Sequence, residues 1–176
     1  MPPIMPAIPD SAAPAPVDPR AGKYLTFQLA GEEFGICVLR VREIMGLQQI
    51  TAVPHTPAHI KGVINLRGKV VPIIDLRLKF GLPAAQYTQR SCIVVTQIQG
   101  ESAPASIGII VDGVSEVLNL TESEIEDTPD FGEEVSGEYL LGMATGKGKV
   151  KILLDIDRIL SAKELDKLHA MAATHA

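Results

Sequence analysis

The chain of 176 residues contains few aromatic side chains, no tryptophan and only two cysteines. Aromatic residues make up 4% of the sequence and apolar residues 46%, so the core has to be built from Val, Ile and Leu. β-Branched side chains favour the pleated, half-buried surface of a sheet. The composition therefore favours a mainly β protein, at a length that suits one compact domain or two small lobes.

Targeting and membrane-spanning segments are absent from the sequence. The N-terminus has no basic region followed by an apolar stretch, as a signal peptide would. No apolar run approaches the ~20 residues that a membrane-spanning helix needs. The cysteines, Cys37 and Cys92, lie in apolar runs without C-x-x-C spacing, which is typical of small core side chains in a reducing compartment. We therefore expect a cytoplasmic protein without direct membrane insertion.

Charge argues against nucleic acid as a partner. The sequence has 21 acidic and 16 basic residues, for a net charge of −5. Phosphate binding needs a cluster of Lys and Arg, and no such cluster occurs.

The sequence also lacks the residue patterns of catalysis and of metal or phosphate binding. His55 and His59 are four residues apart, but Pro57 separates them and a third metal ligand is missing. The glycine-rich stretch 142–149 has neither the spacing nor the Ser or Thr of a phosphate-binding loop, and predicts a hairpin turn. No serine lies in a G-x-S-x-G elbow, and neither cysteine has a nearby histidine. These absences predict a binding module without enzymatic activity and without a cofactor.

An internal repeat is the strongest positive feature. Residues 62–80 match residues 142–160 at an offset of 80, and residues 35–44 match residues 108–117 at an offset of 73. Two matches in the same order indicate two similar lobes, which we place at about 21–88 and 89–160.

Apolar alternation predicts short strands along both halves. In the first half, the pattern predicts strands at 23–30, 33–38, 50–53, 60–66 and 69–74, with a short helical or irregular crossover at 39–45. In the second half, it predicts strands at 92–99, 106–111, 114–120, 139–144 and 150–154. Asp75 and Asp155 occupy equivalent positions and are predicted to cap short helices. Such spacing is typical of small antiparallel barrels.

The ends of the chain differ in composition from the rest. Seven of the first twenty residues are proline, so residues 1–20 are predicted to form a disordered tail. Residues 161–176 begin with the capping box Ser161-Ala162-Lys163-Glu164 and are predicted to form a C-terminal helix with a fraying end.

Three stretches resemble the CheW family of chemotaxis coupling proteins. They are the hairpin around Y-L-T-F at 24–27, the segment V-R-E-I-M-G at 41–46, and the segment 62–76. The most specific piece is N-L-R-G at 65–68 followed by V-P-I-I-D-L at 71–76. The resemblance covers about residues 22–160.

The resemblance implies a fold of two small, pseudo-repeated, five-stranded β-barrels (SH3-like) with short helices. It implies an adaptor without activity that binds the CheA histidine kinase and the cytoplasmic tips of chemoreceptors. The receptor-binding residues implied by the motifs are Glu43, Ile44 and Arg67. The implied kinase-binding residues are Leu25, Val38 and Val41.

Other interpretations remain open for these residues. Leu25, Val38 and Val41 suit core packing equally well, since a partner and a core require the same side chains. Arg67 could be a surface charge or could form a buried pair with Asp75 or Glu43. Gly62 and Gly68 are interpreted as structural turn residues. The alternative function is a small-barrel ligand-binding domain or an enzyme of unknown substrate.

Overall fold

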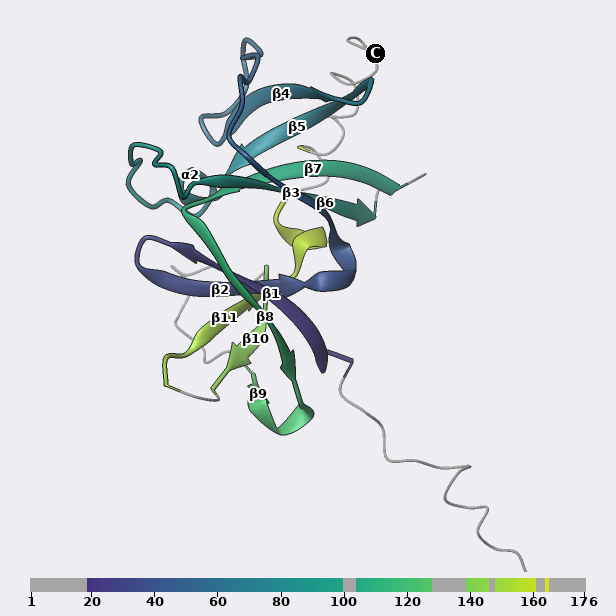
Figure 1. The fold of residues 1–176 in the computed structure, drawn as a ribbon, viewed down its shortest axis with the longest axis vertical. Coiled ribbons are helices and arrows are strands. Elements are labelled where there is room, and N and C mark those ends of the chain that lie inside the picture. Colours follow the sequence, from purple (N-terminus) through teal and green to yellow (C-terminus); the bar gives the residue numbers. More distant parts are fainter. Residues whose placement is uncertain (1–18, 100–103, 128–138, 146–147, 161–163, 165–176) are drawn as a thin grey trace, which may run out of the picture.

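The structure, a computed structural model, describes residues 19–99, 104–127, 139–145, 148–160 and 164. These residues form two β-sheets, which we call sheet A and sheet B (Figure 1). Sheet A has six strands in the order β8-β1-β2-β11-β10-β9, and sheet B has five in the order β3-β6-β7-β5-β4. The sequence prediction of a mainly β protein is confirmed.

Short hairpins and tight connections supply most of the strands. Sheet A contains β1 (Gly22–Leu29), β2 (Glu32–Cys37), β8 (Gly113–Leu120), β9 (Ile125–Glu126), β10 (Leu140–Ala144) and β11 (Lys151–Leu154). Sheet B contains β3 (Val41–Gly46), β4 (Ile60–Leu66), β5 (Lys69–Asp75), β6 (Cys92–Gln99) and β7 (Pro104–Val111). The short helices are η1 (Val38–Arg40), α2 (Leu76–Lys79), η2 (Glu122–Glu124) and η3 (Ile156–Arg158).

The repeat seen in the sequence is present in the pairing of the strands. In sheet A, Leu153 of β11 pairs in parallel with Gly35 of β2, and in sheet B, Ile73 of β5 pairs in parallel with Gly108 of β7. Leu153 is equivalent to Ile73 at the offset of 80 residues, and Gly108 is equivalent to Gly35 at the offset of 73. The register shifts of β10 and β4, just before Gly142 and Gly62, are also equivalent. Strand β1 is equivalent to β6 at an offset of 69 residues, since Tyr24 pairs with Cys37 as Ile93 pairs with Ile110.

The two sheets nevertheless do not follow the predicted lobes. Sheet A joins β1 and β2 from the first half of the chain to β8 through β11 from the second, and sheet B joins β3, β4 and β5 to β6 and β7. The division at residues 88 and 89 therefore separates the sequence repeats, but it does not separate the sheets. The chain crosses between the sheets after β2 and again after β7, so the repeats exchange strands.

The strand count and the closure of the sheets also differ from the expectation. Sheet B has the predicted five strands, whereas β9 adds a sixth to sheet A. Within the described ranges, the strand pairs leave both sheets open, because no pair joins β8 to β9 or β3 to β4. Alternation in the sequence reveals strands, but sheet closure depends on how edge strands meet in space.

The largest hydrophobic core contains buried side chains from both sheets. Phe27 and Ile36 of sheet A and Ile74 and Ile109 of sheet B are fully buried members of it. A row of stacked rings, Phe27–Phe34–Phe80–Tyr139, has centroid separations of 6.0, 5.9 and 5.0 Å. Each fully buried side chain of this size contributes ~1.5–3 kcal/mol relative to exposure. This shared core holds the two sheets together.

The local predictions have mixed outcomes. Both predicted hairpins of the first half are confirmed by β1–β2 and β4–β5. The crossover at 39–45 is mostly wrong, since η1 ends at Arg40 and β3 follows. The strand at 50–53 is reduced to one bridge between Thr51 and Val63. Of the predicted disordered tail at 1–20, residues 1–18 lie outside the described residues, whereas residues 19 and 20 form a turn, and Arg20 donates to the Leu141 backbone oxygen at 3.2 Å. Except for Glu164, the predicted C-terminal helix also lies outside the described residues.

Candidate protein-interaction surface

The turn between β4 and β5 presents Arg67 at the edge of sheet B. Arg67 and Gly68 both have positive φ, at 51° and 86°, as the two central residues of a type I′ turn require. The Asn65 side-chain oxygen accepts a hydrogen bond of 2.9 Å from the Gly68 backbone N–H. Glycine at position 68 is therefore a requirement of the turn, as the sequence indicates.

Gly62 lies at an irregularity inside β4, away from the turn. Its φ is +141°, and a Cβ atom there would be 2.0 Å from the backbone oxygen of Thr51. This close approach occurs where Thr51 and Val63 exchange backbone hydrogen bonds of 2.9 Å. The expectation of a structural glycine agrees with this geometry, but the glycine serves a bulge instead of a turn.

Arg67 and Glu43 form a bidentate ion pair. The Arg67 guanidinium donates to the two carboxylate oxygens of Glu43 at 3.1 and 2.8 Å. The hydrogen bond from Arg67 lowers the pKa of Glu43 and correspondingly raises the pKa of Arg67. Since β3 and β4 are the two edges of sheet B, this pair links opposite edges of the sheet. Arg67 pairs with Glu43, as one open interpretation has it, but the pair is not buried, because the Arg67 side chain is 73% exposed.

A groove of about 290 Å³ lies around this pair. It is lined by Arg42, Glu43, Leu66, Arg67, Lys69, Val71, Val95, Gln97 and Ser106. Three cations and one carboxylate therefore surround a short apolar floor. Ile44 is 45% exposed, whereas its neighbours Glu43 and Met45 are partly buried. Ile44 therefore lies on the other face of β3, and the structure brings together only two of the three predicted receptor-binding residues.

The sequence model of the CheW-like domain matches residues 23–164. The chain belongs to the CheW family. A chemotaxis protein CheW of Klebsiella aerogenes is 41% identical over 153 residues, which are 87% of this chain and 90% of that protein. A chemotaxis protein CheW of Bacillus subtilis is 38% identical, over 78% of this chain and 86% of that protein.

A solved structure shares the fold. The crystal structure of the scaffolding protein TtCheW from Thermoanaerobacter tengcongensis has a TM-score of 0.73 and 33% sequence identity. The similarity covers 82% of this chain and 97% of that one. As a member of the CheW family, the protein is a non-catalytic scaffold of chemotaxis signalling.

The residues predicted to meet a kinase lie at different depths in this CheW-family protein. Leu25 is 3% exposed and belongs to the main core, so it offers no surface to a partner. Val38, the first residue of η1, and Val41, which follows η1, are both half-buried. Leu39 between them is 79% exposed, and the sequence analysis missed it. A three-residue helix between two strands breaks the alternation from which exposure is inferred, which explains the omission.

The rest of the described chain offers little chemistry of other kinds. No group of three or more His, Cys, Asp or Glu side chains is arranged there to hold a metal. His59, one of the two weighed metal ligands, contacts the Glu164 carboxylate through Nε2, and Lys79 donates to the same carboxylate at 2.9 Å. Within the ranges that the structure describes, no helix is long and apolar enough to cross a membrane.

Proposed function

We propose that this CheW-family protein couples chemoreceptors to the CheA histidine kinase by binding both in the cytoplasm. The observation that carries the proposal is the presence of two partly exposed surfaces, which adjoin each other at the start of β3. One is the groove around the Glu43–Arg67 pair, and the other is the surface of Val38, Leu39 and Val41. A protein that holds two partners at fixed positions can transmit a change in one to the other.

The groove is the proposed receptor site. Arg42, Arg67 and Lys69 give it an excess of positive charge, which suits an acidic stretch on a receptor helix. The Leu66 and Val71 side chains provide apolar contacts at its floor. Ile44, on the other face of β3, extends the proposed contact around the edge of the sheet.

The surface around η1 is the proposed kinase site. Leu39 is the most exposed large apolar side chain of the described residues, and exposed apolar groups beside a half-buried rim are typical of protein interfaces. Val38 and Val41 flank it. Leu25 lies beneath this surface and is proposed to support it without touching the kinase.

Two variants test the proposal. Purified protein is titrated calorimetrically with CheA and, separately, with a receptor cytoplasmic fragment. Arg67→Glu is expected to weaken receptor binding about tenfold, or ~1.4 kcal/mol, and to leave CheA binding unchanged. Leu39→Asp is expected to weaken CheA binding and leave receptor binding unchanged.

Each variant is the matched control of the other, since both change one exposed side chain. Loss of both interactions by either variant would contradict two separate sites. Failure of the unmodified protein to bind CheA or the receptor fragment would reject the proposed function.

A further inference from the structure

Asp75 shows how one half of the repeat satisfies a capping aspartate. Its Oδ1 accepts from the backbone N–H groups of Arg77 and Leu78, which begin helix α2. Its Oδ2 accepts a hydrogen bond of 2.7 Å from the hydroxyl of Tyr87. Burial, together with this hydrogen bond to Asp75, raises the pKa of Tyr87, so the phenol stays protonated and remains a donor. The second carboxylate oxygen is therefore occupied by a phenol from the chain itself.

Asp155 is the equivalent residue, at the offset of 80, and its second oxygen has a different environment. Its Oδ1 accepts from the Asp157 backbone N–H at 3.1 Å, which begins η3. Its Oδ2 is 3.5 Å from the Nε atom of Arg158, whose side chain is 69% exposed. A separation of 3.5 Å with an exposed partner is a weak contact.

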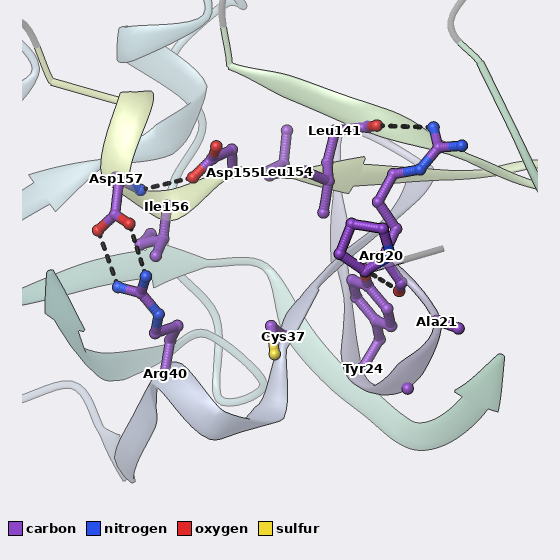
Figure 2. Close-up of a pocket in the computed structure, with 12 residues that line it drawn as sticks. Arg20, Ala21, Tyr24, Cys37, Arg40, Leu141, Leu154, Asp155, Ile156 and Asp157 are labelled. Atoms are coloured by element: carbon purple, nitrogen blue, oxygen red, sulfur yellow. Dashed lines mark hydrogen bonds and ion pairs between the residues drawn. The ribbon is translucent and has the colours of Figure 1, made fainter. Parts of the chain in front are cut away.

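A cavity of about 270 Å³ lies beside Asp155 (Figure 2). Its apolar lining comes from Ala21, Cys37, Leu154 and Ile156 among others. The Arg40–Asp157 pair, with contacts of 2.6 and 2.8 Å, lies on one side of Asp155 in Figure 2, and the Arg20 and Tyr24 side chains lie on the other. Pockets for drug-sized ligands are typically about 300–1,000 Å³, so this volume suits a group of about one ring.

The repeat relates one edge of this cavity to the segment that follows Tyr87 in the other half. The lining segment 19–22 enters β1 as the segment 88–91 enters β6, because β1 and β6 correspond at an offset of 69 residues.

The chain has no other tyrosine for this position. It contains three tyrosines, Tyr24, Tyr87 and Tyr139. The Tyr24 hydroxyl donates to the Arg20 backbone oxygen at 2.6 Å, and the Tyr139 ring stacks on Phe80. A phenol at Asp155 must therefore come from another molecule.

We propose that the cavity beside Asp155 binds a phenol group, such as a tyrosine side chain, from a molecule other than this chain. The hydroxyl donates to Asp155 Oδ2, as Tyr87 does to Asp75. The ring contacts Cys37, Leu154 and Ile156. This site does not depend on the proposed coupling function, because neither the groove at Arg67 nor Leu39 contributes to it.

The test uses p-cresol as the probe and the full chain labelled with ¹⁵N. Binding is expected to shift the backbone amide resonances of Cys37, Asp155 and Ile156, and toluene, which lacks the hydroxyl, is expected to bind at least fivefold more weakly. Asp155→Asn keeps an oxygen to cap η3 and replaces the other oxygen by a donor, so p-cresol affinity is expected to fall at least fivefold. Equal affinity for the Asn variant, or shifts confined to other residues, would overturn the proposal.

Two further variants keep the test decisive. Ala21 is half-buried, and Ala21→Leu is expected to fill the cavity and abolish p-cresol binding. This variant tests the site even if the Asp155→Asn variant does not fold. Tyr87→Ala opens the equivalent space at Asp75, and p-cresol is expected to raise its thermal stability more than that of the unmodified protein. Unchanged p-cresol binding by a folded Ala21→Leu variant would show that the ring lies elsewhere.

The source of the phenol is separated by comparing two probes. Binding of the blocked peptide acetyl-Gly-Tyr-Gly-amide assigns the site to a tyrosine side chain of a protein. Binding of p-cresol without binding of the peptide assigns it to a small phenol. Binding of neither probe rejects the site.

Discussion

An arginine–aspartate pair lies at each of the two crossings between the sheets. At one crossing the connecting segment provides the aspartate, and at the other it provides the arginine. After β7, Asp112 accepts from Arg77 of α2 at 2.9 and 2.7 Å. After β2, Arg40 of η1 donates to Asp157 of η3 at 2.8 and 2.6 Å. Arg77 and Asp157 occupy equivalent positions at the offset of 80, so the arginine of one half faces the aspartate of the other.

The two pairs show that the fold has an ion pair at each crossing, whereas the segment that provides the arginine differs between them. At each crossing, a residue of the connecting segment contacts a short helix that follows a hairpin. Asp112 contacts α2, which follows β5, and Arg40 contacts η3, which follows β11. Both polarities occur in this fold, and both pairs are bidentate. Gly62 and Gly142 show the opposite case, in which the same residue type is kept at both positions under different steric constraints.

The largest expected effect breaks this glycine comparison. Gly62→Ala is expected to destabilise the fold by ~3 kcal/mol or more, because its Cβ would overlap a backbone oxygen at positive φ. Gly142→Ala is expected to lose only ~1–2 kcal/mol, because its nearest contacts are 2.9 Å away and one is a flexible arginine. Urea denaturation measures both. Equal losses would show that the two bulges impose the same constraint.

A second comparison concerns Val41 and its equivalent Val114. Both are partly buried against the main core, so an aspartate at either position is expected to cost ~2 kcal/mol in the free energy of unfolding. Leu39→Asp is expected to change stability by less than ~0.5 kcal/mol, because Leu39 is exposed. Urea denaturation of the three variants checks the order. A stability of Val41→Asp equal to that of the unmodified protein would place Val41 at the surface.

A charge exchange sharpens the comparison of the two crossings. Arg77→Asp and Asp112→Arg are each expected to lose ~1–2 kcal/mol, and the double variant is expected to recover ~1 kcal/mol of coupling by reproducing the polarity of the Arg40–Asp157 pair. A double-mutant cycle by thermal denaturation measures this coupling. A coupling energy near zero would mean that the polarity of each pair depends on neighbours such as Ala30, whose N–H also binds Asp112.

The smallest expected effect is on acid stability. Burial alone raises the pKa of Asp112, but hydrogen bonds from Arg77 and the Ala30 N–H outweigh it, so the pKa is below its ordinary value. A depressed folded-state pKa contributes stability above the unfolded value of ~3.9 that is lost as pH falls through the folded value. We expect Asp112→Asn to flatten the pH dependence of unfolding below pH ~4, measured by circular dichroism. An unchanged profile would contradict this role.

Local chemistry explains the features that could be predicted from the sequence. Asp75 and Asp155 cap short helices as predicted, since a cap depends on residues two or three positions away. Thr121 and Glu124 have the spacing of a capping box, and the Glu124 carboxylate accepts from the Thr121 backbone N–H. Arg67 and Gly68 form a two-residue turn for the same reason. The predicted binding residues stay predictions, and the sequence did not indicate that Leu25 is buried and Leu39 is exposed.

The sequence by itself determined the strands, their turns and the repeat, because alternation and turn chemistry act over a few residues. Only the tertiary structure decided that β1 and β2 join the sheet of the second half, that Glu43 meets Arg67 across sheet B, and that a cavity lies beside Asp155, whereas Tyr87 lies beside Asp75. Alternation tells which side chains of a strand share a face, but not which strand lies next to it. That choice depends on the shared core, to which distant parts of the chain contribute at the same time.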